Sequence, residues 1–221
     1  PFYDFPLMMN SGRLKGWLLK EESIFDMVAD VLLSLKEEAF DGMLYAMGDG
    51  NHSLATAKAF FQTLRRRCDE AGYGDILLCP ETMGKINQLG DLDEVLELCT
   101  LDERLIPCID FGHLYARSLG ADDGQEAFVR MLDRVEEVLG TERASRFHSH
   151  FSHIEFTPKG GEKCHRTFAD DGGFGPDWAP LAAEIARRGW SPTFICESAG
   201  TQAEDALEMK KIYQEALAAQ E

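Results

Sequence analysis

The sequence predicts an α/β protein in which about four β-α units build a parallel sheet behind an N-terminal α/β segment. In the second half of the chain, short apolar runs bounded by turn-forming or polar residues alternate with longer amphipathic segments. This alternation is typical of strands and helices in a parallel sheet. With 221 residues and 44% hydrophobic content, the chain can bury a core as one domain or as two small ones.

The N-terminal part, residues 1–72, is predicted to contain a helix, a short strand and a long helix. The sequence IFDMVADVLLSLKEEA has the periodicity of an amphipathic helix at residues 24–39, and GMLYAM is a short strand at 42–47. A glycine-rich turn, GDGNHS, leads into a long helix that is expected to end near Gly72. Three adjacent arginines, 65–67, fan around this helix, so we expect them on a solvated surface.

The C-terminal part, residues 73–221, shows the strand-then-helix order four times. The predicted strands are DILLCPE, RLIPCID, RFHSHFSHIEF and TFICES, and the helices that follow them are DLDEVLELC, GQEAFVRMLDRVEEVLG, DWAPLAAEIARRG and TQAEDALEMKKIYQEALAA. Because parallel strands end at one shared edge, we expect the polar side chains that follow them to converge there.

Charge and cysteine usage limit the classes of function. The formal net charge is −17, from 39 acidic and 22 basic residues, so the bare surface should repel phosphate backbones and anionic membranes unless bound cations invert the local field. The six cysteines form no CxxC pair. There is no basic-then-apolar leader, and no apolar run approaches the roughly 18 residues of a membrane span. We therefore expect a cytoplasmic protein.

Ligand-type residues cluster around the predicted strand ends. Glu81, Asp110 and Glu197 each end an apolar run, and five histidines fall in the second half of the chain: His113, His148, His150, His153 and His165. Carboxylates and imidazoles together suit Zn²⁺ or Mn²⁺, so a metal site is the leading hypothesis. The alternative is that the acids merely cap the following helices.

The run HSHFSH alternates, as a strand does. His148 and His150 are therefore expected on one face together with Ser152, and His153 on the other. A metal ligand on that face and a merely solvated polar face both fit the pattern, but clustered imidazoles followed by His165 favour at least one ligand.

A weaker pattern points to phosphate binding. Gly48 and Gly50, beside His52 in GDGNHS, let the backbone approach an anion at the start of a helix, although plain strand-to-helix turns look the same. Lys85 and Arg117 are further candidate phosphate contacts, and Lys85 fits a surface residue equally well.

Residues from about 75 to the C-terminus resemble the C-terminal half of the endonuclease IV family, within the xylose-isomerase-like TIM barrels. CPETMGK, LIPCIDFGHLYAR, HSHFSHIEF, GGEKCH and CESAGTQAED carry the resemblance, which covers about two-thirds of the chain. Members are metal-dependent, typically tri-zinc, phosphodiesterases that cut DNA beside abasic sites. The resemblance implies that Glu81 and Glu197 act in catalysis, Glu197 near the nucleophilic water, and that the metal ligands are Glu81, Asp110, His113, His148 or His150, His165 and Glu197.

The chain departs from that family in two ways. The aspartate expected two places before the ligand histidine falls on Lys163, with Glu162 beside it, so one ligand is lost or displaced. Two further histidines expected from the first half of the barrel are missing, since His52 is the only upstream histidine. A TIM barrel usually needs about 250 residues and eight strands, so we expect a partial barrel, either open or covered by a homodimer partner.

The segment FYDFPLMMNSGRLKGW and the GDGNHS turn resemble a different family, domain of unknown function 1015, which implies a fusion near residue 70. Two other functions therefore stand beside metal-dependent cleavage of damaged DNA. One is isomerisation of a sugar or sugar phosphate on the same kind of barrel. The other is a catalytically inactive or truncated fusion that serves as a binding protein.

Overall fold

The computed structural model describes residues 1, 3–6, 13–16 and 49–220. The predicted helix at 24–39, the predicted strand at 42–47 and Gly48 lie outside these residues. The chain divides into two compact units, Pro1–Gly48 and Asp49–Glu221. The sequence had placed a functional boundary at 72/73, and that division of function stays a prediction.

In the first unit, the described residues form an antiparallel pair of strands, β1 (Tyr3–Pro6) and β2 (Arg13–Gly16). The side chains of Arg13 and Asp4 form an ion pair across it.

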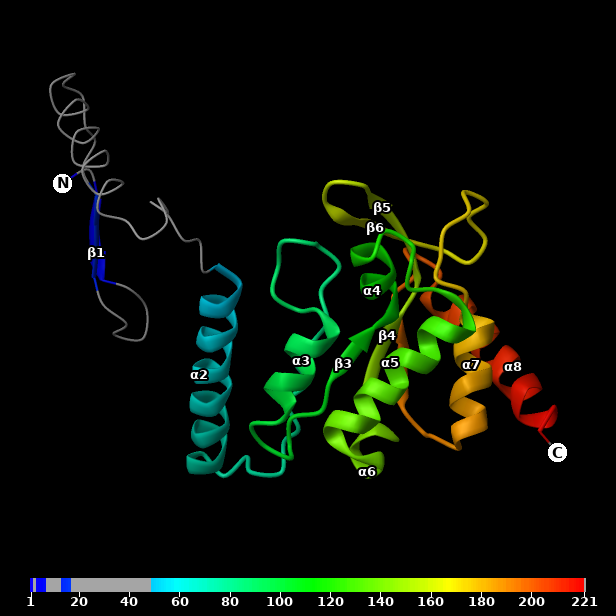
Figure 1. Cartoon of the computed structure of the whole chain (residues 1–221), viewed down its shortest axis with the longest axis horizontal. Helices are drawn as coiled ribbons and strands as arrows, with labels where there is room; N and C mark the ends of the chain where they lie inside the picture. The colour runs from blue at the N-terminus through cyan, green and yellow to red at the C-terminus, as the bar shows by residue number, and fades with distance from the viewer. Residues whose placement is uncertain (2, 7–12, 17–48, 221) are drawn as a thin grey trace, which may run out of the picture. The chain divides into compact units, whose positions relative to one another are not determined.

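The second unit is built on a parallel sheet (Figure 1). Its strands β3 (Cys108–Asp110), β4 (His148–Phe151) and β7 (Thr193–Cys196) pair in the order β3-β4-β7. The parallel α/β prediction is therefore confirmed, and the strands described here do not close into a barrel.

The predicted strand at 75–81 runs parallel beside β3 but pairs only through isolated bridges, Leu78 with Leu105 and Glu81 with Cys108. The interruption has a local cause. Leu78 exchanges backbone hydrogen bonds with Arg104 and Ile106, but Pro80 has no N–H to continue the ladder.

The predicted C-terminal helices are confirmed. Asp91 begins one of them with a capping box, in which its side chain accepts a hydrogen bond from Glu94 N and the Glu94 side chain accepts one from Asp91 N. The helices of this unit are α2 (Asp49–Glu70), α3 (Leu92–Cys99), α4 (Phe111–Arg117), α5 (Gly124–Leu139), α6 (Thr141–Ala144), α7 (Trp178–Arg188) and α8 (Gln202–Ala218).

Two details of α2 differ from expectation. The helix begins at Asp49, so Gly50 and His52 lie in its first turn and not in a turn before it. The prediction that all three arginines are solvated is wrong for Arg65, which is 4% exposed. Its guanidinium donates to the carbonyls of Tyr73, Gly74 and Ile76, and thereby holds the chain that leaves the helix.

The largest correction concerns the run RFHSHFSHIEF, which is not one strand. It breaks at Ser152, and β5 (His153–Thr157) then pairs antiparallel with β6 (Gly161–Arg166). The break lets the hairpin pass against the start of α4 at Gly112, where an added Cβ would lie 2.6 Å from Ile154 Cγ1. In Figure 1 the hairpin lies above the carboxyl ends of β3 and β4.

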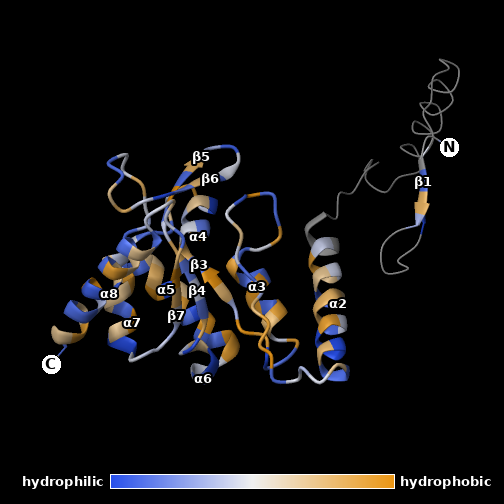
Figure 2. Ribbon diagram, turned by 180° about the vertical axis from the view of Figure 1, so that it is seen from behind, coloured by the Kyte–Doolittle hydropathy of each residue, from blue (hydrophilic) through white to orange (hydrophobic). Residues whose placement is uncertain are grey.

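The core lies between the sheet and the helices on one of its sides. Its aromatic side chains interlock: Phe111 packs against Phe128 and Phe147, with ring centroids 5.7 and 6.2 Å apart, and Trp178 packs against Phe194 at 4.8 Å. Figure 2 shows hydrophobic residues along β3 and on the adjoining parts of α3 and α5. This packing fixes the strands and so fixes where they end.

The opposite side of the sheet, which we call the open face, carries the side chains that alternate with the core positions. It includes Cys79, Cys108, His148 and Ile195, and also the apolar Leu77 at the edge. Leu77 is 52% exposed and Ile195 45% exposed. Among the described residues, no helix is long and apolar enough to cross a bilayer.

Candidate metal centre

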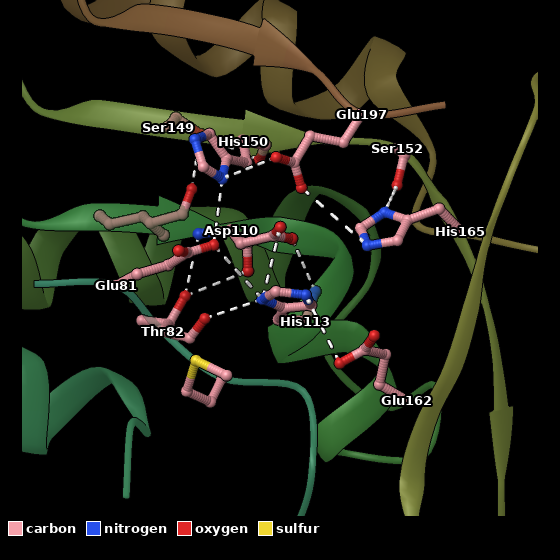
Figure 3. A network of polar contacts seen from close by, with 12 residues as sticks. Glu81, Thr82, Asp110, His113, Ser149, His150, Ser152, Glu162, His165 and Glu197 are labelled. Atoms are coloured by element: carbon pink, nitrogen blue, oxygen red, sulfur yellow. Dashed lines mark hydrogen bonds and ion pairs between the residues drawn. The ribbon is translucent and has the colours of Figure 1, made fainter. Parts of the chain in front are cut away.

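Acids and histidines from four neighbouring chain segments meet above the carboxyl edge of the sheet (Figure 3). One ligand atom from each of four residues lies within 4.8 Å of the others, and we call this set the carboxylate group: Glu81, Asp110, His150 and Glu197. Each comes from a different segment of the parallel sheet, as the sequence predicted from the shared strand ends.

His150 is at the centre of the carboxylate group. Its Nδ1 lies 3.0 Å from Glu81 Oε1 and 3.3 Å from Glu197 Oε1. The imidazole therefore links acids from the two outer segments of the sheet. This geometry places His150, of the two histidines that the sequence left open, among the carboxylates.

Asp110 combines a capping role with an orphaned oxygen. Its Oδ1 accepts from His113 N at 2.8 Å and begins α4, so the helix-cap interpretation is correct for this acid. Its Oδ2 is buried without a hydrogen-bond partner. Burial raises the pKa of this carboxyl, because an ionised oxygen needs a compensating charge there. A cation at the carboxylate group would supply that charge.

A second set, the histidine group, adjoins the first and consists of His113, Glu162 and His165. His113 Nδ1 lies 2.8 Å from the Thr82 carbonyl, which can only accept, so Nδ1 carries the proton and Nε2 is the available nitrogen. That Nε2 lies 3.6 Å from Glu162 Oε2. Burial lowers the pKa of His113, but Asp110, the Thr82 carbonyl and Glu162 outweigh it, so that the pKa is raised.

Ser152 orients His165. Its Nδ1 lies 2.8 Å from Ser152 Oγ, and its Nε2 lies 4.0 Å from Glu197 Oε2. The rings of His113 and His165 are 5.7 Å apart. Ser152 and Thr82, which the sequence did not single out as supports, thus aim the two imidazoles of the histidine group at one point.

Glu162 reaches the site because of a β-bulge. In the β5–β6 pairing, Glu155 opposes Cys164 and Phe156 opposes Glu162, so Lys163 is the extra residue. One extra residue reverses the alternation, which puts Glu162 on the same face as His165. Lys163 instead pairs with Glu155 outside the site. The ligand expected at 163 is therefore displaced to 162, and a bulge leaves no clear signal in the sequence.

Gly84 allows this approach. Its carbonyl accepts from Glu162 N at 3.0 Å. A Cβ at this position would lie 2.6 Å from Glu162 Cβ and 3.1 Å from His113 Cδ2. Only glycine lets the loop after Glu81 pack so closely against both members of the histidine group.

The other two histidines of the HSHFSH run, His148 and His153, belong to neither of these groups. His148 and His150 have ring centroids 5.4 Å apart, and with Cys108 they form a third set, the thiol group, whose ligand atoms also lie within 4.8 Å of one another. Burial lowers the pKa of His148. His153 lies on β5, in a different sheet from His148 and His150, and stacks on Phe168 at 4.7 Å, so the face predicted from one continuous strand does not apply to it.

The predicted phosphate contacts are not gathered at the site. Arg117 donates to the carbonyls of Lys85 and Gln88, each at 2.8 Å, so its guanidinium holds the loop that carries Gly84. Lys85 itself is exposed. Gly50 and His52 lie in the first turn of α2, and Gly48 lies outside the described residues. A phosphate role for these residues stays a prediction.

The fold and the site together define the class of this protein: a parallel β/α protein with a candidate metal centre at the carboxyl ends of its strands. Residues 40–219 match the family model described as xylose isomerase-like TIM barrel, and the chain belongs to this family. The match begins upstream of residue 75 and includes α2, so it does not support the resemblance of this helix to domain of unknown function 1015.

Among curated proteins, the chain is similar to an uncharacterized protein of Methanocaldococcus jannaschii. The two are 39% identical over 141 residues, which is 64% of this chain and 50% of that protein. The chain thus spans about half the length of this relative.

Proposed function

We propose that this protein is a divalent-metal-dependent phosphodiester hydrolase that resembles endonuclease IV and acts on DNA at abasic sites. The observation that carries the proposal is the adjacency of the two groups. His113 Nδ1, in the histidine group, lies 3.4 Å from Asp110 Oδ2 and 3.7 Å from Glu81 Oε1, in the carboxylate group. Two neighbouring cation sites suit the displacement of one phosphate oxygen by another.

The residues fit a metal. The carboxylate group offers three acids and one imidazole, and the histidine group two imidazoles and one acid, a set that suits Zn²⁺ and also Mn²⁺. The buried Oδ2 of Asp110 accepts no hydrogen bond and has His113 Nδ1 at 3.4 Å, so a bound cation would stabilise its charge further. We propose zinc because nitrogen ligands form nearly half of the combined set.

Bound divalent ions would lower the pKa of a water and polarise a phosphoryl group. Side chains of the protein would accept the proton and hold the two groups in place. Glu197 is one-third exposed and spans from His150 to His165, so its carboxylate would accept a proton from the attacking water. Glu81, which faces both His150 and His113, would keep the two groups together.

A sugar or sugar phosphate isomerase is the second candidate, since the fold family also includes sugar isomerases. The net charge of −17 favours it, because a strongly acidic protein repels a nucleic-acid backbone more than a small substrate. A catalytically inactive or truncated binding protein is the third. No comparison supports the resemblance of residues 1–70 to domain of unknown function 1015, so the fusion stays a hypothesis.

The test incubates the protein with Zn²⁺ or Mn²⁺ and either an abasic-site duplex or a panel of aldoses and their phosphates. Strand scission without ketose formation supports the hydrolase, and ketose formation without scission supports the isomerase. The inactive interpretation stands if neither product forms and the purified protein contains no metal.

The matched variants are Glu81→Gln and Glu103→Gln. Glu81→Gln should lower both the bound metal and the rate of strand scission by at least about 10-fold, because even residues that only orient metal ligands contribute that much. Glu103 is an exposed acid outside the ligand groups, so its amide variant should behave as wild type. Equal metal content and scission in the two variants would show that the site is misplaced.

A further inference from the structure

Two ligand-type side chains on the open face, Cys108 and His148, have no role in the proposed reaction. They lie two residues before Asp110 and His150 on the same strands. Cys108 on β3 is the Cα partner of His148 on β4, as Asp110 is of His150. Directly opposed residues point to the same side of a sheet. The Sγ of Cys108 is therefore within 4.8 Å of ligand nitrogens of His148 and His150.

The chemistry of the thiol group differs from that of its neighbour. A thiolate with two imidazoles favours a soft or borderline ion, whereas carboxylate-rich sets also take Mn²⁺. Three protein ligands are enough for zinc, which completes its tetrahedron with water or substrate. The three residues come from two adjacent strands whose positions the core fixes.

His150 belongs to both groups, and only one of its nitrogens can carry a lone pair while the ring is neutral. Its Nδ1 faces Glu81 and Glu197, which leaves Nε2 as the nitrogen for the thiol group. An ion there would be supported by donation of the Nδ1 proton to Glu81, an arrangement common around metal-bound histidines. An ion in the carboxylate group needs Nδ1 unprotonated instead.

We propose that Cys108, His148 and His150 form a second metal site for a thiophilic divalent ion such as zinc or cadmium, and that it competes with the carboxylate group for His150. When the ion binds, the S–H bond of Cys108 is replaced by a sulfur–metal bond and one proton leaves to solvent. A thiophilic ion bound at this site would make His150 unavailable as a ligand for an ion in the carboxylate group.

Cobalt titration tests the site without any assay of activity. A cobalt–thiolate bond gives a near-ultraviolet charge-transfer band that carboxylate and imidazole ligands do not give. The band should develop in the wild-type protein, be lost in Cys108→Ser and in His148→Gln, and persist in Cys68→Ser, which removes a thiol from α2. A wild-type protein without the band, or a band that persists in Cys108→Ser, overturns the proposal.

Two further measurements complete the test. Far-UV circular dichroism of each metal-free variant identifies any that fails to fold, and His148→Gln decides the result if Cys108→Ser is the one that fails. Excess Mn²⁺ should raise the cobalt midpoint of the thiolate band in the wild type but not in Asp110→Asn, which weakens the carboxylate group. An equal midpoint with and without Mn²⁺ in the wild type overturns the competition, and because no cleavage is measured, the hydrolase proposal is tested separately.

Discussion

At Lys163, one extra residue in β6 decides which acid faces the site. Because of the bulge, Glu162 faces His113, and Lys163 forms an ion pair with Glu155 outside the site. The ligand types and their order could be predicted from the sequence because acids and histidines follow apolar runs. The bulge could not, because it depends on the register of the hairpin and not on the composition of β6.

The first prediction compares the two neighbours at this bulge. Glu162→Gln should weaken zinc binding by the histidine group by about 10-fold or more, since an amide lacks the charge of a carboxylate ligand. Lys163→Gln should leave zinc affinity unchanged, because that side chain lies outside the site. Competition with a chromophoric chelator measures both. The bulge assignment is wrong if Lys163→Gln has the larger effect.

The second prediction concerns Gly84. A methyl group there meets Glu162 Cβ at 2.6 Å, so Gly84→Ala should cost about 1–3 kcal/mol in the free energy of unfolding, as overpacked sites do. Gly74→Ala is the control, since the added Cβ meets only the ends of two flexible side chains, the Asp69 carboxylate at 3.3 Å and the Arg104 guanidinium at 3.9 Å. Urea unfolding compares the variants. Equal stability of Gly84→Ala and wild type would contradict the close packing.

At the scale of elements, local signals identified the helices, and long-range pairing decided the strands. Asp91 and Asp177 cap α3 and α7, and Gly189 ends α7 in a left-handed conformation, so these boundaries could be predicted from the sequence. The β5–β6 hairpin was missed because the polar alternation of HSHFSH favoured one strand, although the apolar residues change from odd positions (Phe147, Phe151) to even positions (Ile154, Phe156) across Ser152. The break depends on contact with Gly112, more than 30 residues earlier in the chain.

The third prediction concerns the ion-pair network that joins α2 to the rest of the second unit. Arg104 binds Asp102 at 2.7 Å and Asp69, near the end of α2, also at 2.7 Å. Arg104 lowers the pKa of Asp102 to about 2, despite partial burial. A lowered folded pKa adds stability above the ordinary value of 3.8, and that stability is lost as pH falls from about 4 toward 2.

Asp102→Asn should therefore be less stable than wild type by about 1 kcal/mol at pH 6, a value reduced for solvent screening because the pair is partly exposed. The difference should shrink as pH falls below 4. Urea unfolding at several pH values measures it, with Asp75→Asn, an exposed acid, as control. A difference that stays constant from pH 6 to the acid limit would show that charge is not the cause.

At the scale of the whole molecule, the sheet has two unpaired edges among the described strands, at 75–81 and at β7. Exposed strand edges and apolar patches favour association. The chain also matches only half the length of its archaeal relative. The partial barrel was predicted from the count of strands, whereas what covers it in solution depends on partners that one chain does not specify.

The last prediction is that the open face associates with a second copy of the chain. Leu77 and Ile195 lie on this face at opposite edges of the sheet, both about half exposed, and burying two such side chains contributes about 3 kcal/mol. Replacing both with lysine should therefore weaken a dimer by about 100-fold. Light scattering across a concentration series measures the change, and Leu207→Lys, at an equally exposed position on α8, is the control because it lies on an outer helix. A wild-type chain that stays monomeric at the highest concentration, or a dimer that only Leu207→Lys dissociates, would place the association elsewhere and leave the open face to a different partner.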